Sequence, residues 1–426
     1  MTRIYNKQNN VLFIIDTVRC MRYSKNKQND IRFMEVKNMM KEKMTFPVGY
    51  YRFHEDEGLN FQMNRFFTYG VFSKEELMDI GKSIDSFEKW ILIFTELGRK
   101  EEKAGNILKA AICYRAAQFY TLSGEKAADG KSLKRILYDR CVELFNEYYF
   151  EIYPQLRFIR IPYEGYELPV YYSTCEDAVD TVVIHGGYDS ICQDFIMMIP
   201  YFMERHFNVY FFEGPGQGEV LMHHDARMTP EWEHCTGAVL DYFRLDDVTL
   251  IGISLGGYLA TRAAAYDKRI ARLVMYDLIY DFYGAILNKM GKGGKLFDYL
   301  TRHPQNILWR YINRKLDQKY FTKWLLLQGY AIYENIHTPC EYFNHIKKFN
   351  TVEISKLITQ DTLVLAGAGD IYTVFYKEQL DALVNAKSVT GRLFIKEESA
   401  DHHCQVGNMG LLLDTISEWI REKCNG

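Results

Sequence analysis

The segment Gly252–Gly256 has the pattern Gly-x-Ser-x-Gly, with Ser254 between the two glycines. The apolar run Val248–Ile253 predicts a buried strand, and the alanine-rich stretch after Gly257 predicts a helix. A sharp turn from strand to helix exposes a serine hydroxyl for attack on a carbonyl carbon, and it needs glycines where the backbone is crowded. The amino end of the helix also stabilises negative charge beside the serine. We expect Ser254 to act as a nucleophile; the alternative is an ordinary strand-to-helix turn.

A serine nucleophile needs a base, and the base needs an acid that orients it. In sites built on such a turn the three residues follow in the order Ser, Asp or Glu, His. Asp370 follows the strand-like run Thr362–Leu365, and His402 and His403 follow the run Arg392–Ile395. Since the carboxyl ends of parallel strands meet at one edge of a sheet, we expect Asp370 to lie beside the base. Spacing alone leaves His402 and His403 both open as that base.

The negatively charged oxygen of a tetrahedral intermediate needs two N–H donors already in place. We expect one from the backbone of Leu255, directly after the serine. The other is expected from Gly187 or Tyr188, in the glycine loop after the strand-like run Val182–Ile184. His185 in the same loop is expected to be a structural hydrogen-bonding residue rather than a second base. This loop and the serine turn together predict an oxyanion site.

Three acidic residues lie where the leaving group of a substrate could meet them. These are Glu213, Asp277 and Asp281, each close to the end of an expected strand. A carbon leaving group must be protonated or delocalised as it departs, so cleavage of a carbon–carbon bond should need such an extra acid, whereas an ester needs only the histidine. The alternative for each residue is a turn or cap that accepts hydrogen bonds from backbone N–H groups.

Two other motifs suggest ligands but lack the full pattern. The glycine-rich stretch Glu213–Gly218 is not followed by Gly-Lys-Ser or Gly-Lys-Thr, and its spacing fits no dinucleotide-binding fingerprint. His223, His224 and Asp225 are adjacent in the chain, and adjacent residues seldom reach the same metal ion. We therefore predict neither a metal nor an organic cofactor.

Length and composition limit the class of protein. The chain has 426 residues, of which 48% are hydrophobic and 15% aromatic, which is too long for one compact core. A net charge of −3 gives no reason to expect nucleic acid or an acidic membrane as a partner. The nine cysteines form no C-x-x-C pair, and no apolar run reaches the roughly 18 residues of a membrane span. We expect a cytoplasmic protein with reduced thiols.

Helical periodicity before Pro154 predicts a helical N-terminal domain, residues 44–153. In it, a capping box at Ser73–Glu76 is expected to begin a helix that continues through Trp90 to about Leu97. After Pro154, short apolar runs alternate with helical segments, which is typical of an α/β fold with a mostly parallel sheet. Aromatic-rich helical segments at about 282–355 interrupt this alternation and predict a lid inserted into the catalytic domain, 154–426. Residues 1–43 are expected to be a poorly defined extension.

Five motifs in chain order resemble one branch of the α/β-hydrolases. They are Gly-Gly-Tyr-Asp-Ser (186–190), Glu-Gly-Pro-Gly-Gln-Gly (213–218), Gly-Ile-Ser-Leu-Gly-Gly (252–257), Gly-Ala-Gly-Asp (367–370) and His-Cys-Gln-Val-Gly-Asn (403–408). The branch includes the 2,6-dihydroxypseudooxynicotine hydrolase, fungal hydrolases that shorten polyketides and the fermentation-respiration switch protein group. Residues 60–65, Asn-Phe-Gln-Met-Asn-Arg, look like the start of its helical N-terminal domain. The similarity covers roughly residues 44–424.

The resemblance implies Ser254 as nucleophile, Asp370 as acid and His403 as base, because the base of the branch directly precedes Cys-Gln. Some members of the branch cleave carbon–carbon bonds next to a ketone. We therefore predict a serine hydrolase for a small aromatic or acyl carbonyl substrate, with a plain carboxylesterase or a non-catalytic binding protein as alternatives. Neither nucleic acid nor membrane is expected as a partner, and a homodimer is left open.

Overall fold

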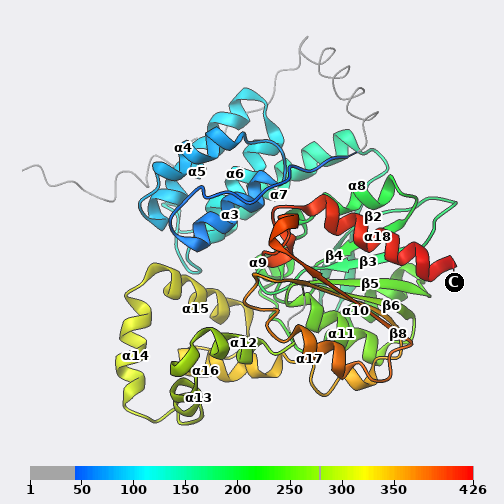
Figure 1. Cartoon of the computed structure of the whole chain (residues 1–426). Helices are drawn as coiled ribbons and strands as arrows, with labels where there is room; N and C mark the ends of the chain where they lie inside the picture. Colours follow the sequence, from blue (N-terminus) through cyan, green and yellow to red (C-terminus); the bar gives the residue numbers. More distant parts are fainter. Residues whose placement is uncertain (1–43, 278–279, 426) are drawn as a thin grey trace, which may run out of the picture. The chain divides into compact units, whose positions relative to one another are not determined.

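A sheet of eight strands forms the centre of the larger part of the chain. The computed structural model describes residues 44–277 and 280–425 (Figure 1); the predicted extension, residues 1–43, lies outside the described residues. The strand order is β1-β2-β4-β3-β5-β6-β7-β8. The strands are β1 (Arg157–Tyr163), β2 (Tyr166–Ser173), β3 (Thr181–His185), β4 (Asn208–Phe212), β5 (Val248–Ile253), β6 (Ile270–Tyr276), β7 (Asp361–Gly367) and β8 (Ser388–Phe394).

Most strands of the sheet pair in parallel. β1 pairs with β2 around the turn at Glu164 and Gly165, and β2 pairs antiparallel with β4. From β4 through β3, β5, β6 and β7 to β8 every pairing is parallel. β5 and β7 are buried at every position, so both faces of the sheet must be covered. The predicted α/β class with a mostly parallel sheet is confirmed.

Helices cover both faces of the sheet. In Figure 1, α8 (Met198–Met203) and α18 (Met409–Asn425) lie on one side, and α10 (Glu233–Phe243), α11 (Gly256–Tyr266) and α17 (Tyr376–Ala382) lie on the other. α9 (Gly218–His224) follows β4. Between β6 and β7 the chain forms α12 (Phe282–Lys289), α13 (Gly294–Arg302), α14 (Leu308–Asp317), α15 (Tyr320–Ile332) and α16 (Pro339–His345). This group, the insertion, falls within the segment predicted as a lid.

The described chain divides into two compact units, residue 44 with 84–152 and residues 45–83 with 153–425. The segment predicted as one helical domain is therefore shared between them. The single helix expected from Ser73 to about Leu97 is wrong, because α4 (Lys74–Lys82) ends and α5 (Phe87–Ala104) begins separately. The hydroxyl of Ser86 accepts a hydrogen bond from the Lys89 N–H (3.2 Å) and caps α5, which ends the continuity of the helical pattern.

The smaller unit is a three-helix structure of α5, α6 (Ile107–Tyr120) and α7 (Leu133–Ile152). α6 is buried on nearly all sides, which explains its alanine-rich sequence. The indole of Trp90 is fully buried and donates to the Ala116 carbonyl at 2.8 Å. A methyl group on Gly98 would lie 3.3 Å from the Cys113 and Tyr114 side chains, so this glycine lets the helices pack closely.

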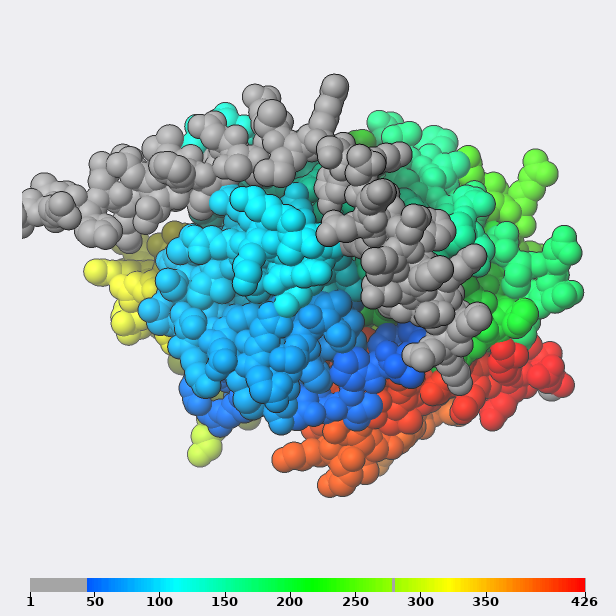
Figure 2. All heavy atoms as spheres, turned by 90° about the horizontal axis from the view of Figure 1, so that it is seen from above, coloured from blue at the N-terminus to red at the C-terminus, as the bar shows by residue number. Residues whose placement is uncertain are grey.

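The N-terminal segment of the larger unit packs against the C-terminal part of the same unit. The N–H of Gly49 donates to the Gly407 carbonyl at 2.8 Å, and Figure 2 shows this blue segment beside the red C-terminal part. α3 (Glu57–Phe67) supplies Asn64, whose side chain bonds both the N–H and the carbonyl of Tyr51 (2.7 and 2.8 Å). Arg65 of α3 forms a largely buried ion pair with Asp194 at 2.7 Å.

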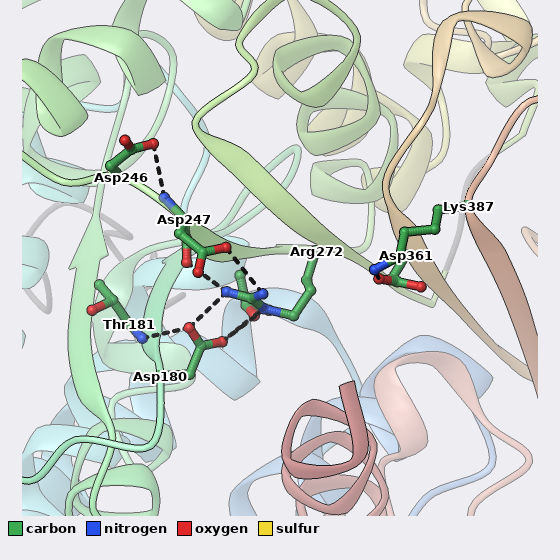
Figure 3. Close-up of polar contacts among 8 residues, drawn as sticks. Asp180, Thr181, Asp246, Asp247, Arg272, Asp361 and Lys387 are labelled. Carbon is green, nitrogen blue, oxygen red and sulfur yellow. Dashed lines mark hydrogen bonds and ion pairs between the residues drawn. The ribbon is translucent and has the colours of Figure 1, made fainter. Parts of the chain in front are cut away.

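A charged cluster lies near the amino ends of β3, β5 and β6, and Figure 3 shows its polar contacts. Arg272 on β6 binds Asp180, just before β3, through two hydrogen bonds of 2.9 and 3.1 Å. It also pairs with Asp247, just before β5, at 3.1 Å. The guanidinium of Arg272 thus connects three neighbouring strands near their amino ends.

No helix in the described part of the chain is long and apolar enough to cross a membrane.

Candidate active site

Ser254 lies on the turn between β5 and α11, at the carboxyl edge of the sheet. Its φ of +61° is in the left-handed region, which costs a non-glycine residue about 1–3 kcal/mol and is held by the surrounding structure. A Cβ on Gly252 would lie 1.9 Å from the Gly256 carbonyl oxygen, and one on Gly256 would lie 2.7 Å from the Gly186 carbonyl oxygen. The turn therefore needs both glycines of the motif, as expected.

His403 connects the serine to a carboxylate. Its Nε2 lies 2.9 Å from Ser254 Oγ, and its Nδ1 lies 2.6 Å from Asp370 Oδ2. Asp370 follows β7 and also accepts a hydrogen bond from the Tyr372 N–H (3.0 Å). The structure thus brings together the three residues that the sequence placed at strand ends. With Nδ1–H donated to a carboxylate, Nε2 is free to accept the serine proton.

Asp277 also contacts this histidine. Its Oδ2 lies 2.7 Å from His403 Nδ1, and its side chain is fully buried. The other hydrogen bonds of its carboxylate come from the N–H groups of Gly367 and Cys404 and from the side-chain amide of Gln405. The sequence interpretation put Asp277 on the leaving-group side, but the structure puts it against the nitrogen of His403 that faces away from Ser254.

The side chains of His403, Asp370 and Asp277 shift one another's pKa values. Burial alone would lower the pKa of His403, but the negative charge of Asp370 and that of Asp277 outweigh it and raise this pKa well above its usual range. Burial raises the pKa of Asp370 to about 6, against the effect of His403 and with a further contribution from the charge of Asp277. Burial also opposes ionisation of Asp277, yet His403 and the donated hydrogen bonds hold its pKa below the usual value. Asp277 is the more acidic of the two carboxyls.

The glycine loop after β3 lies against the serine turn. A Cβ on Gly187 would lie only 2.8 Å from the Leu255 nitrogen, so the absence of a side chain leaves space beside that N–H. This is where an oxyanion bound by Leu255 and the loop would need room. Tyr188 is buried, with its ring against those of Phe282 and Tyr333.

Gln217 holds the shape of this loop, a role that the sequence interpretation did not assign. Its amide nitrogen donates to the carbonyls of Gly186 (2.8 Å) and Gly187 (3.1 Å), and its side-chain oxygen accepts from the Gly214 N–H (3.1 Å). Gln217 thus fixes the direction of two consecutive carbonyls of the loop. The signal was present in the motif Gly-Pro-Gly-Gln-Gly, where one amide follows two turn-forming glycines.

The other candidate residues take structural positions. Asp281 caps α12 and accepts from the Gly284 N–H at 2.9 Å. Glu213 is buried and accepts from the N–H groups of Cys192 (2.7 Å) and Glu219 (2.6 Å). His185 is fully buried, its Nδ1 is 3.0 Å from the Gly186 carbonyl, and burial lowers its pKa to about 4. These contacts agree with the turn, cap and structural alternatives considered for the three residues.

Two aromatic rings lie near His403. The ring of Tyr372 lies 5.2 Å from that of His403, and the ring of Phe61 on α3 lies 6.3 Å from it (centroid to centroid). Phe61 belongs to the Asn-Phe-Gln-Met-Asn-Arg motif, so this motif brings a ring to the site as well as fixing its own segment. The sequence interpretation did not place α3 at the histidine, because nearly 350 residues separate Phe61 from His403.

One group in the described part of the chain has the ligand spacing of a metal site: Asp277, His403 and Cys404, with their ligating atoms within 4.8 Å of one another. His403 Nδ1 is already within hydrogen-bond distance of two carboxylates, and burial raises the pKa of the Cys404 thiol, which disfavours the thiolate. Hydrogen bonding accounts for the cluster without a metal. His223, His224 and Asp225 are exposed, and Asp225 pairs with Arg227 at 2.8 Å.

Comparison with known proteins identifies the family of the chain. The α/β hydrolase fold family matches residues 182–406, and the chain belongs to this family. The chain is 28% identical over 266 residues to hydrolase acrC of Aspergillus aculeatus, a match that covers 58% of this chain and 61% of that protein. It is 28% identical over 242 residues to the 2,6-dihydropseudooxynicotine hydrolase of Paenarthrobacter nicotinovorans, covering 52% and 63%. The predicted resemblance to this branch is confirmed.

The matches leave part of these relatives uncovered. Hydrolase ORFZ of Pyricularia oryzae is 32% identical over 190 residues, which is 40% of this chain and 45% of that protein. Among solved structures, the 2,6-dihydroxy-pseudo-oxynicotine hydrolase aligns with a TM-score of 0.56 at 18% identity, covering 86% of this chain and 95% of that one. AbyA5 aligns with a TM-score of 0.60 at 15% identity, covering 83% and 93%. These two likenesses concern the fold.

Proposed function

We propose that this α/β hydrolase is a serine hydrolase in which Ser254, His403 and Asp370 form the catalytic triad. The observation that carries the proposal is the continuous chain of contacts from Ser254 Oγ through His403 Nε2 and Nδ1 to Asp370 Oδ2, with distances of 2.9 and 2.6 Å. Membership in a hydrolase family supports it further. Both distances are within the range expected for a nucleophile, its base and the acid that orients the base.

The residues would act in a fixed sequence. Ser254 Oγ attacks the carbonyl carbon while Nε2 of His403 takes its proton, and the N–H groups of Leu255 and of Gly187 or Tyr188 hold the resulting oxyanion. His403 returns the proton to the leaving group, and a water molecule then hydrolyses the acyl-enzyme by the same route. The carboxylates that raise the pKa of His403 would stabilise the imidazolium that each step forms.

We propose a small carbonyl compound with an aromatic or acyl group as substrate. The rings of Tyr372 and Phe61 beside His403 would suit such a group. The name of the 2,6-dihydropseudooxynicotine hydrolase identifies one relative that acts on a compound of low molecular mass. The eight described cysteines are free thiols, which supports a cytoplasmic setting.

A plain carboxylesterase is the second candidate, and the positions of the acidic residues favour it. Asp281 and Glu213 are engaged by backbone N–H groups, and Asp277 lies behind His403. Each of the three acids expected to assist a carbon leaving group thus contacts other groups of the protein. Ester cleavage needs only His403 as the proton donor. A non-catalytic binding protein is disfavoured because such a protein would not need the three aligned side chains.

The experiment is labelling of the purified chain with a fluorophosphonate, followed by a comparison of aryl esters with aryl β-diketones as substrates. Ser254→Ala should abolish labelling and lower turnover by at least about a thousandfold. Thr261→Ser, on the helix that follows the serine, is a matched control whose hydroxyl bonds only within α11. Labelling at a different serine, or full turnover by Ser254→Ala, would refute the proposed nucleophile.

A further inference from the structure

His403 is in contact with two carboxylates through the same ring nitrogen. Nδ1 lies 2.6 Å from Asp370 Oδ2 and 2.7 Å from Asp277 Oδ2. Asp370 comes from the loop after β7 and Asp277 from the end of β6, and these two strands are parallel neighbours. The two distances differ by too little to make one carboxylate the partner and the other a bystander. Nδ1 is therefore hydrogen-bonded to Asp370 and in close ionic contact with Asp277.

Asp277 is fixed in this position more firmly than Asp370 is. It has a φ of +58°, a conformation that a non-glycine residue adopts at a cost of about 1–3 kcal/mol and that neighbouring contacts must hold. Its carboxylate accepts from Gly367 N–H (3.2 Å), Cys404 N–H (2.5 Å) and Gln405 Nε2 (3.0 Å). The charge of His403 and these donors keep the carboxylate ionised although burial opposes it, and one of the donors is the backbone of the residue directly after His403.

We propose that Asp277 is a second positioning carboxylate for His403, able to hold Nδ1–H toward the sheet and Nε2 toward Ser254 when Asp370 is absent. This inference rests on the proposed function, since it concerns how the base of that reaction is oriented. Orientation and tautomer are what the acid of a triad supplies, and loss of the correct tautomer in a triad with one acid lowers turnover by about 10⁴-fold. With two carboxylates beside the same nitrogen, the loss of one of them leaves the other to orient His403.

A purely structural role for Asp277 is the competing explanation. Its carboxylate joins β7, through Gly367, to the loop that carries His403, and this would stabilise the fold whether or not it oriented the imidazole. The two explanations differ in what they require of Asp370. If Asp277 only stabilises the fold, Asp370 is the sole acid. Removal of Asp370 should then lower kcat/KM by about 10³- to 10⁴-fold without changing the thermal midpoint.

The experiment measures kcat/KM on an aryl ester, fluorophosphonate labelling rate and thermal midpoint for Asp370→Asn, Asp370→Ala, Asp277→Asn and the double variant. Asp370→Asn and Asp370→Ala should each lower kcat/KM by no more than about tenfold, whereas the double variant should lose about 10³- to 10⁴-fold. The alanine variant cannot donate a competing hydrogen bond to Nδ1. Asp361→Asn, at the opposite end of β7 and bonded to Lys387 and Ser388, is the matched control with unchanged kcat/KM.

The pH profile adds a measure that a structural role would not produce. In Asp370→Asn, one negative charge beside His403 is lost and Asp277 remains, so the acidic limb of kcat/KM should move to lower pH while activity persists. Asp277→Asn brings an amide among three donors and could unfold the chain, but the Asp370 variants test on their own whether Asp277 orients His403 when Asp370 is absent.

A loss of about 10³-fold or more in Asp370→Asn or Asp370→Ala, with the thermal midpoint unchanged, would overturn the inference. So would a full loss in a folded Asp277→Asn variant beside an unaffected Asp370→Asn, because Asp277 would then be the sole acid. Ser254→Ala, run in parallel, separates these results from a failure of the proposed function. If Ser254→Ala abolishes labelling and Asp370→Asn is also inactive, the triad stands and only the shared role of Asp277 fails.

Discussion

The imidazole of His402 stacks on the phenol ring of Tyr50, with centroids 3.5 Å apart and planes inclined by 21°. His403, the next residue, has its Nε2 2.9 Å from Ser254 Oγ. The backbone at His402 is extended (φ −87°, ψ 166°), so the two neighbouring side chains point in opposite directions. The ambiguity between two adjacent histidines is thus removed by a packing partner that lies about 350 residues earlier in the chain.

This relationship predicts very different effects for the two histidines. His403→Ala should lower kcat/KM by at least about a thousandfold, because it removes the base, whereas His402→Ala should cost at most about tenfold. Loss of the stack on Tyr50 should instead lower the thermal midpoint of His402→Ala slightly. Steady-state kinetics and thermal unfolding of both variants test this. The reverse order of the two activities would contradict the assignment of His403.

The loop that Gln217 holds gives a second prediction. Gln217→Glu replaces the amide donor by an oxygen that faces the carbonyls of Gly186 and Gly187, so the loop should move away from Leu255. We expect a loss of about 10- to 100-fold in kcat, since displacements of about 1 Å in a site have effects of this size.

Gln379→Glu is the matched control for that variant. Gln379 is also fully buried, but its side chain bonds Thr351 and Ser355, which lie outside the triad. The control should lower the thermal midpoint without a comparable loss of kcat. Equal kcat values for Gln217→Glu and Gln379→Glu would show that Gln217 does not position the oxyanion loop.

Strand ends could be predicted from the sequence, and with them the neighbourhood of Ser254, Asp370 and His403. Short apolar runs mark buried parallel strands, and the carboxyl ends of such strands share one edge of the sheet. The contact of Asp277 with His403 could not be predicted, because it depends on a φ of +58° at one residue after a strand. The local sequence pattern placed Asp277 near the site, but it did not show which way the side chain points.

Contacts between segments far apart in the chain also escaped prediction. The motif around Phe61 and Asn64 resembled the start of a helical domain, but nothing in its periodicity shows that it packs beside His403. The break between α4 and α5 was missed because the capping box at Ser73 begins a helical pattern that looks continuous. Ser86, the residue that caps α5, is one polar residue among several and carries no distinct signal.

The third prediction concerns Glu213 and the pH dependence of stability. This side chain is 3% exposed, and burial raises its pKa to about 7 against two backbone hydrogen bonds, with the charge of Glu219 raising it further. Because the folded pKa is higher than the ordinary glutamate value of 4.5, the folded state holds this proton more tightly. The contribution is fully present below about pH 4.5 and is lost as the pH rises to about 7.

Linkage puts the size of this effect at about 3 kcal/mol of unfolding free energy across that window. The free energy of unfolding, measured with urea at several pH values, should therefore fall more steeply between pH 5 and 7 in the wild type than in Glu213→Gln. The amide of the variant meets the N–H groups of Cys192 and Glu219, so its stability should be lower than that of the wild type at low pH. The difference in slope is what tests the prediction, and parallel curves for the two proteins would show that Glu213 is ionised throughout the range.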